Sequence, residues 1–438
     1  METINIGIIG FGTVGTGVAK ILLSNSHLIE KRIGVRLHLK YIADIDLITD
    51  RGVNLNDGVL INDADTILND PDIHIIVETV GGDTFAKNLL LKAIEKGKHI
   101  VTANKALLAK HGNMIFEQAL NRKISIGYEA SVGGCMPVIK TLRETLVGNK
   151  IQAMLGILNG TCNYILTKIA YEKSPFEAAL EEAQKNGYAE ADPTFDVEGI
   201  DTAHKLAILI SIAYGMKINF NDIYVEGISN ITPLDIEIAE QFGYRIKLLA
   251  ISKYNGNAVE ARVHPTMIPM SNLLSGVNGS LNAIAIQGDA VGNMALYGYG
   301  AGMMPTASAI ISDIADIARD MISGAKIRVP ALGFQNEHIK EIPVLPIDEV
   351  NTQYYIRFAA IDKPGVLSSI SGILGNHHIS IKSVHQKGQN QQGAVPVVMM
   401  TYRAKESNIQ AALKEITALH IIERDPMLIR IEDNNQTI

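Results

Sequence analysis

The sequence predicts a multidomain α/β protein whose first part is a doubly wound parallel sheet. Strand-like and helical segments alternate from residue 4 to residue 128, and a glycine-rich turn follows the first strand. A proline-containing linker at residues 330–351 precedes a segment with the element order βαββαβ. A chain of 438 residues is too long for one hydrophobic core, so two or three domains are expected.

The glycine-rich turn predicts a dinucleotide site of Rossmann type. An apolar strand at residues 4–9 runs into Gly10-Phe11-Gly12-Thr13-Val14-Gly15, and a helix continues to about residue 23. The first glycine permits the tight turn, the second lets a pyrophosphate approach the backbone, and the third lets the helix pack on the strand. The helix N-terminus then supplies amide donors for the phosphate. The alternative is a turn with a purely structural role.

The second strand, at residues 35–43, ends at Asp44. A carboxylate there accepts the ribose hydroxyls of NAD and disfavours a 2′-phosphate. The first arginine after it is Arg51, so the sequence favours NAD over NADP.

The alternation places further polar residues where a nicotinamide is expected to lie. Strands are expected at residues 73–78, 99–102 and 124–128, and helices at residues 84–96 and 105–121. Ligands of such sheets bind at the carboxyl ends of the strands, where Thr79, Thr102, Asn104 and Lys105 lie. Lys105 is either a surface lysine in a first helical turn or a second cation in the cleft.

From Glu129 the pattern changes. The turn at residues 129–137 offers backbone carbonyls and one carboxylate, which suit a hard monovalent cation; a plain interdomain hinge is the alternative. Mixed helices and strands follow, including a strand pair near residues 250–252 and 260–265. The glycine-rich turn at residues 298–306, with Gly302, begins a helix that returns the chain to the nucleotide-binding domain.

The expected domains are therefore three. Residues 1–130 and about 300–345 form the dinucleotide-binding domain, residues 131–299 form an inserted α+β substrate-binding and dimerisation domain, and residues 352–432 form a ferredoxin-like module. This last module contains no catalytic cluster, so a binding or regulatory role is expected.

An acidic stretch at residues 187–205 is the candidate catalytic segment. A helix from about residue 200 to residue 214 puts Asp201 and Lys205 one turn apart on one face, and Glu190 and Asp196 lie on the preceding loop. The simplest alternative is a surface ion pair. The residues after Lys205 are apolar on every side, however, so this lysine enters the interior, where its pKa becomes adjustable for proton transfer.

Composition excludes several classes of function. The formal net charge is −7 and no basic block occurs, so no nucleic-acid partner is expected. No apolar run is long enough to span a membrane, and the N-terminus shows no export signal. Two cysteines, Cys135 and Cys162, suit a reducing cytoplasm.

Over essentially its whole length the sequence resembles the homoserine dehydrogenases with a C-terminal ACT domain. The motifs that carry the resemblance are Ala183…Gly187-Tyr188-Ala189-Glu190…Asp192-Pro193…Asp196-Val197…Gly199…Asp201…Lys205, then Thr102–Lys105, Glu129–Pro137, Asn159–Asn163 and Gly300–Thr306. The turn Asp362-Lys363-Pro364-Gly365-Val366-Leu367 is similar to effector-binding turns of ACT modules. The resemblance implies reversible, NAD(P)-dependent interconversion of L-homoserine and L-aspartate 4-semialdehyde in threonine, methionine and isoleucine biosynthesis.

The resemblance also implies roles for individual residues. Lys205 is the acid/base, with Asp201 as its partner and Lys105 as helper on the substrate oxygen. Substrate binding falls to Glu190, Asp196, Lys105, Asn159, Gly160 and Thr161. A sodium site is implied at the Glu129 side chain and the carbonyls of Val132, Gly134 and Met136. An amino acid, L-threonine as end product, is the expected effector, bound by Asp362, Pro364, Gly365, Val366 and Leu367, and a homodimer or homotetramer is expected.

Two positions depart from the family pattern, and both are cysteines. Cys135-Met136 stands where a glycine and a branched apolar residue are expected, and Cys162 stands where a threonine is expected. Oxidation of these thiols could inhibit the enzyme; buried packing residues are the favoured alternative.

Two rival functions remain open at this stage. One is a semialdehyde dehydrogenase that forms a thioester on Cys135, although no histidine lies near that cysteine in the sequence to activate it. The other is a sensor that binds cofactor and amino acid without turnover.

Overall fold

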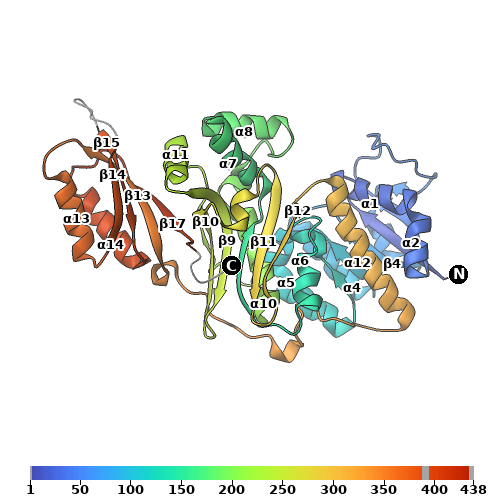
Figure 1. Cartoon of the computed structure of the whole chain (residues 1–438). Coiled ribbons are helices and arrows are strands. Elements are labelled where there is room, and N and C mark those ends of the chain that lie inside the picture. The colour runs from blue at the N-terminus through green and yellow to red at the C-terminus, as the bar shows by residue number, and fades with distance from the viewer. Residues whose placement is uncertain (1, 387–393, 434–438) are drawn as a thin grey trace. The chain divides into compact units, whose positions relative to one another are not determined.

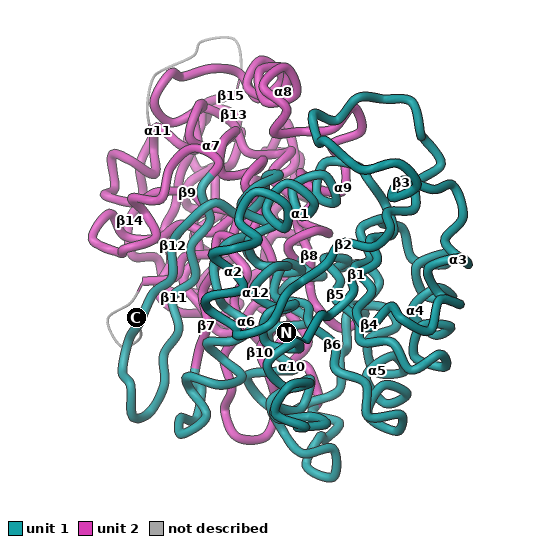
Figure 2. The backbone as a smooth tube through the Cα atoms, turned by 90° about the vertical axis from the view of Figure 1, so that its right-hand side faces the viewer, with its two compact units in different colours: residues 1–152, 203–221, 281–342 teal, residues 153–202, 222–280, 343–438 magenta. Residues whose placement is uncertain are grey.

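The computed structural model describes residues 2–386 and 394–433, which form two compact units (Figures 1 and 2). Unit 1 comprises residues 1–152, 203–221 and 281–342, and unit 2 comprises residues 153–202, 222–280 and 343–438. The helix α10 (Ile200–Tyr214) and the strand β7 (Ile151–Ile157) each begin in one unit and continue in the other. The functional domain boundaries expected from sequence stay predictions.

Unit 1 contains the expected parallel sheet, in the order β3-β2-β1-β4-β5-β6. Every pairing in it is parallel, and the direction of strand addition reverses between β1 and β4. This confirms the doubly wound class, whose ligands bind beside that reversal. The strands are β1 (Thr3–Ile9), β2 (Arg36–Ala43), β3 (Leu60–Ile61), β4 (Ile73–Glu78), β5 (His99–Thr102) and β6 (Ile126–Gly127).

Helices cover the sheet in the pattern that the strand–helix alternation predicts. They are α1 (Thr13–Ser24), α2 (Ser26–Ile33), α3 (Ala64–Asn69), α4 (Thr84–Glu95), α5 (Lys105–Arg122), α6 (Val138–Lys140), a π-helical turn (Thr141–Thr145) and α12 (Met303–Ser323). Val18 and Leu22 of α1 and Ile310 and Ile314 of α12 share one hydrophobic core with the strands. Gly17 permits this packing, because a Cβ there would lie 2.7 Å from the carbonyl oxygen of Met303. The antiparallel hairpin β11 (Leu281–Gly288) and β12 (Gly292–Tyr299) also belongs to unit 1.

Unit 2 is built on the long antiparallel pair β9 (Tyr244–Tyr254) and β10 (Val259–Pro269), which is longer than the sequence predicted. On one side β9 pairs with β7, and on the other β10 pairs in parallel with β17 (Met427–Ile431). The unit also contains α7 (Gly160–Glu172), α8 (Phe176–Lys185), α9 (Thr194–Val197), β8 (Tyr224–Val225) and α11 (Pro233–Gln241).

The C-terminal segment confirms the predicted βαββαβ order. Its elements are β13 (Asn351–Ile361), α13 (Val366–Asn376), β14 (Ile381–Gln386), β15 (Ala394–Thr401), the short β16 (Ala404–Lys405), α14 (Glu406–Thr417) and β17. The strand order β17-β13-β15-β14 is that of a ferredoxin-like sheet, with Tyr354, Phe358, Ile370 and Ile409 in its core. The last strand of this segment begins directly after Pro426.

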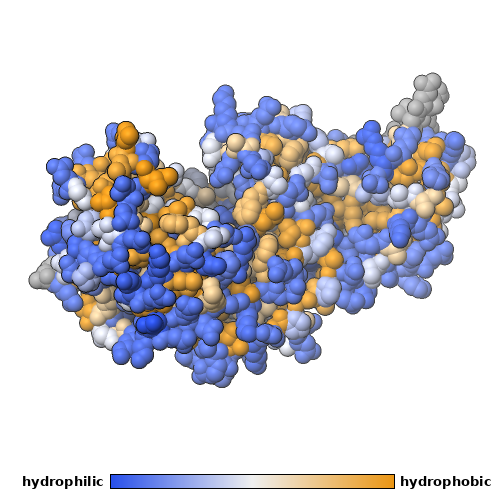
Figure 3. Space-filling view, turned by 180° about the vertical axis from the view of Figure 1, so that it is seen from behind, coloured by the Kyte–Doolittle hydropathy of each residue, from blue (hydrophilic) through white to orange (hydrophobic). Residues whose placement is uncertain are grey.

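Hydrophilic residues cover most of the face shown in Figure 3. Among the described residues, no helix has both the length and the apolar character needed to cross a membrane.

Candidate active site

The glycine-rich turn has the geometry of a dinucleotide cradle. Gly10 has φ +100°, and a Cβ at Gly15 would lie 2.0 Å from the carbonyl oxygen of Gly10. A Cβ at Gly12 would instead point into open space, so the backbone is accessible there. Gly12 precedes α1 without a capping side chain, which leaves the amides of the first helical turn for a phosphate. The residues present therefore fit a dinucleotide.

Thr79 ties this turn to the end of β4. Its hydroxyl donates to the carbonyl of Gly10 at 2.7 Å, as expected for a residue at the switch point of the sheet. The loop after β4 is in turn held to the loop after β5, because Asn104 Nδ2 donates to the carbonyl of Gly82 at 2.6 Å. Asn104 also caps α5 by accepting the amide of Leu107. Thr79, Asn104 and Lys105, the first residue of α5, thus lie on two connected loops.

Glu78 holds the loop after β4 and the end of β5 together, and this role was not identified from sequence. Its side chain is fully buried; one carboxylate oxygen accepts the amides of Val80 and Gly81, and the other accepts the hydroxyl of Thr102 at 2.6 Å. An acidic residue directly after the apolar run Ile75-Ile76-Val77 was the available signal. Glu78 therefore positions both loops at the carboxyl ends of β4 and β5.

Asp44 directly follows β2, and its carboxylate already has neighbours that bind it. Its carboxylate accepts the amides of Phe11 and Asp46, and Arg51 folds back to within 3.6 Å of it and 3.2 Å of Asp46. The Arg51 guanidinium also stacks over the ring of Phe11, with Cζ 5.0 Å from the ring centroid. The structure thus places an arginine beside the glycine-rich turn, although the sequence separates it from Asp44.

Glu129 is buried at the start of the small-residue turn. Its two carboxylate oxygens accept the amides of Ile139 and Lys140, each at 2.8 Å, and its own amide donates to Asp313. Burial, and then the neighbouring carboxylate of Asp313, raise the pKa of Glu129 to about 7. The carboxylate expected to bind sodium therefore also anchors α6.

The carbonyls expected to bind sodium lie in the same turn. Met136 accepts the amide of Val138 at 2.7 Å, and Gly134 has φ +58°. A Cβ at Gly134 would lie 2.6 Å from the carbonyl oxygen of Tyr299, so only glycine fits there. The sodium site stays a prediction.

In unit 2 the Asn159 turn brings together five of the expected site residues. Asn159 Nδ2 donates to Asp196 at 2.8 Å and to Asp201 at 2.9 Å, while its Oδ1 accepts the amide of Cys162 and caps α7, which begins at Gly160. The Thr161 hydroxyl donates to the second oxygen of Asp196 at 3.2 Å. Asn159, Thr161 and Asp201 are each buried, so hydrogen bonds rather than solvent hold the Asp201 carboxylate, whereas Asp196 is half-buried.

Helix α10 carries the candidate catalytic pair, as predicted. It runs from Ile200 to Tyr214, with Asp201 in its first turn and Lys205 one turn later. The exposed fraction is 2% for Asp201 and 7% for Lys205. This burial argues against an ordinary surface ion pair, for which both side chains are largely solvated.

The remaining expected residues lie on exposed segments. Glu190 is exposed, and its carbonyl accepts a hydrogen bond from Gln184 at 3.1 Å. Gly302, with φ +124°, directly precedes α12. Gly365, with φ +91°, directly precedes α13; of the other expected effector residues, Val366 is buried, whereas Asp362, Pro364 and Leu367 are exposed.

The two cysteines differ in environment. Cys135 is exposed, whereas Cys162 is buried and its thiol contacts the carbonyl of Asp196 at 3.1 Å. The buried thiol fits the packing interpretation.

The parallel sheet with its dinucleotide cradle, together with the candidate lysine segment and the ferredoxin-like module, fits a nicotinamide-dependent oxidoreductase. Family models match most of the chain: the NAD-binding domain of homoserine dehydrogenase matches residues 10–129, homoserine dehydrogenase matches residues 137–315, and the ACT domain matches residues 354–420. The chain belongs to the homoserine dehydrogenase family.

Individual relatives support this assignment. The chain is 43% identical to the homoserine dehydrogenase of Neisseria gonorrhoeae over 432 residues, covering 99% of both chains. It is 44% identical to that of Pseudomonas aeruginosa over 440 residues, covering 99% of this chain and all of the relative.

Solved structures agree as well. The homoserine dehydrogenase of Thiobacillus denitrificans has a TM-score of 0.93 at 44% identity, with 99% of each chain covered. A hyperthermophilic archaeal homoserine dehydrogenase in complex with NADPH has a TM-score of 0.62 at 27% identity and covers 75% of this chain and 100% of its own. The resemblance inferred from sequence is confirmed, and both rival functions are set aside.

Proposed function

We propose that the protein reversibly oxidises L-homoserine to L-aspartate 4-semialdehyde, with Lys205 as the acid/base. The observation that carries the proposal is the burial of Lys205 one helical turn after Asp201, whose carboxylate is fixed by Asn159. When bound, a nicotinamide supplies the acceptor for the hydride that leaves the carbinol carbon. The hydroxyl proton of the substrate passes to the neutral amine of Lys205, and the reverse reaction returns it from the ammonium.

Other side chains bind and orient the substrate in this proposal. Asp196, held by Asn159 and Thr161, and the exposed Glu190 attract the substrate ammonium. Lys105, at the start of α5, polarises the substrate oxygen, and its charge favours the neutral form of a second lysine in the same cleft.

Lys205→Ala tests the acid/base role. Homoserine oxidation, followed by nicotinamide absorbance, is expected to fall by about 10²–10⁴ in kcat with cofactor binding retained, because a general base contributes about that factor. Lys110→Ala is the matched control, since Lys110 is a half-exposed lysine of α5 that pairs with Asp83. A Lys205→Ala enzyme as active as wild type would transfer the role to Lys105.

For the cofactor, we propose a preference for NAD. Asp44 supports it, because a carboxylate at this position accepts ribose hydroxyls. Arg51 is the residue that could accept a 2′-phosphate, but its charge is offset by Asp44 and Asp46. Comparison of kcat/KM for both cofactors in wild type and Arg51→Ala tests this: the variant is expected to lose only residual use of NADP. A wild-type kcat/KM that is higher with NADP would contradict the preference.

We also propose a sodium ion at the Glu129 turn, an L-threonine effector on the Asp362–Leu367 turn, a homodimer or homotetramer, and a cytoplasmic location. Cys135 and Cys162, neither of which is in a disulfide bond, support the last. Replacing sodium by choline at constant ionic strength is expected to lower activity.

Gly365→Val should abolish a threonine response, because Gly365 has φ +91°. This substitution is a sharper test than deletion of the module, since β17 also pairs with β10.

A further inference from the structure

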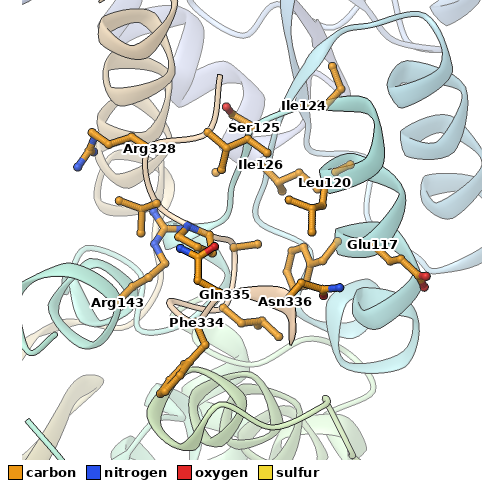
Figure 4. A pocket seen from close by; sticks show the side chains of 18 of the residues that line it. Glu117, Leu120, Ile124, Ser125, Ile126, Arg143, Arg328, Phe334, Gln335 and Asn336 are labelled. Carbon is orange, nitrogen blue, oxygen red and sulfur yellow. The ribbon is translucent and has the colours of Figure 1, made fainter. Parts of the chain in front are cut away.

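A cavity of about 560 Å³ lies in unit 1, beside the edge strand β6 (Figure 4). Its walls come from the second half of α5, residues 124–127, one face of α12 and residues 327–339, which we call the strap. None of the residues assigned above to substrate, nicotinamide cofactor or ACT effector lines it.

The strap is fixed at several points without filling this space. Arg328 pairs with Glu144 at 2.9 Å and with Asp320 at 3.2 Å, and the hydroxyl of Tyr128 donates to the carbonyl of Ala331. Farther along, the amide of Lys340 donates to a carbonyl at the end of α10, at 2.9 Å. Protein interiors normally pack with few voids larger than a water molecule. A cavity of this size, held open by its own strap, is typical of a ligand site.

Arg143 is the cation that the strap covers. Its side chain is 11% exposed, its Nε has no hydrogen-bond partner among the described residues, and its Nη2 lies 3.4 Å from Glu144. In Figure 4 it reaches toward the strap, whereas Arg328 points away from the other lining residues. The strap passes close over it at Gly333, where a Cβ would lie 3.1 Å from Arg143 Cγ. A buried guanidinium with unused donors is a natural partner for a carboxylate.

The other lining groups define the rest of the ligand. The lining carries five acidic residues, Asp313, Asp316 and Asp320 of α12 with Glu117 and Glu337, against three basic ones. Lys140 and Arg319, outside the lining, also pair with Asp316, so the charges around the cavity nearly balance. Balanced surroundings disfavour a doubly charged anion and suit a ligand that carries both a carboxylate and an ammonium group. Apolar side chains complete the wall, including Phe116, Ile126 and Ile317.

We propose that this cavity binds an α-amino acid with an apolar side chain. The carboxylate pairs with Arg143, the ammonium faces the carboxylates of α12, and the side chain packs against Ile126 and Ile317. The site is separate from the C-terminal module and does not depend on the proposed reaction.

The chain contains no tryptophan, so one introduced tryptophan reports on this cavity alone. Leu120 lies on its rim with 38% exposure, and Leu120→Trp in the full chain is the reporter. L-leucine, L-isoleucine and L-methionine are titrated against this variant. Two leucine analogues are titrated as well: 4-methylpentanoate lacks the ammonium group, and 3-methylbutylamine lacks the carboxylate. At least one of the three amino acids is expected to change the emission saturably. The two analogues, and Arg143→Gln in the same background, are expected to weaken binding about tenfold or more, as for loss of a charged hydrogen bond.

Two controls separate this site from any other. Arg122→Gln changes an exposed arginine at the end of α5 outside the lining and is expected to leave binding unchanged. Phe85→Trp, exposed on α4, is expected to give no response. If Leu120→Trp does not fold, Asn336→Trp on the exposed strap replaces it. The proposal is overturned if none of the three amino acids changes the tryptophan emission at millimolar concentration. It is also overturned if Arg143→Gln binds them with the same affinity as the parent variant.

Discussion

The substitution Glu432→Gln tests how much the contact between the C-terminal module and the strand β10 contributes to the free energy of unfolding. Glu432, 7% exposed, bridges Arg262 and Lys253, the latter at 2.7 Å; the Arg262 side chain is 1% exposed. Burial alone would raise the pKa of Glu432, but the two cations outweigh it and lower the pKa from 4.5 to about 2. That difference corresponds to roughly 3 kcal/mol of stability.

The sign of the pH effect follows from the lowered pKa. The contribution of Glu432 is fully present above about pH 4.5 and is lost as the pH falls toward about 2. Glu432→Gln should therefore lower the free energy of unfolding by about 3 kcal/mol at neutral pH, and the difference from wild type should shrink below about pH 4.5.

Urea unfolding at several pH values, combined with hydrogen exchange of β10 and β17, measures this difference. Glu349→Gln is the control, because Glu349 pairs with Lys405 on the surface, where both side chains are more than 40% exposed. Its effect should stay below about 0.5 kcal/mol. An equal effect of both substitutions, or a Glu432→Gln effect that does not depend on pH, would refute the reasoning.

Further predictions concern the cofactor turn, the Asn159 turn and a buried lysine. Gly15→Ala should abolish cofactor binding in fluorescence titration, because the new Cβ would lie 2.0 Å from the Gly10 carbonyl oxygen, whereas Gly148→Ala, which meets nothing within 4 Å, should not. Asn159→Ala should lower kcat and raise KM for homoserine, since Asp196 and Asp201 both lose a donor; unchanged kinetics would argue against this role. Burial lowers the pKa of Lys247 to about 7, so its contribution to stability should rise from about pH 7 to 10.5, and Lys247→Met should remove that rise in unfolding measurements.

Much of the fold was predictable because its signals are local. The strands at residues 73–78 and 99–102 and the helix at residues 200–214 were placed correctly, since periodicity and glycine turns mark their limits. The helix α11 was missed although Thr232 and Asp235 form a capping box at its start and Pro233 is its first residue. The hairpin β11–β12 was missed because β12 is an exposed edge strand without buried alternation.

The candidate site residues were proposed from motifs, but their contacts are long-range and no local pattern encodes them. Asn159 joins Asp196 and Asp201 across a gap of about forty residues, which only the folded chain brings together. Arg51 returns to Asp44 through an irregular loop, so its distance along the sequence misrepresents its distance in space. Glu78 was passed over because a single acidic residue at a strand end has many explanations.

The parallel pairing of β17 with β10 has a consequence for biosynthesis. Arg262 and Glu432 are 170 residues apart, so the arginine leaves the ribosome long before the carboxylate that neutralises it. At about 5–20 residues per second that interval lasts roughly ten to thirty seconds. Until then the edge of β10 that pairs with β17 is open, and Arg262 lacks the carboxylate of Glu432. A chain interrupted before β17 therefore retains an unpaired stretch of β10 and an Arg262 without Glu432, a state that is expected to be more open to proteolysis than the finished chain.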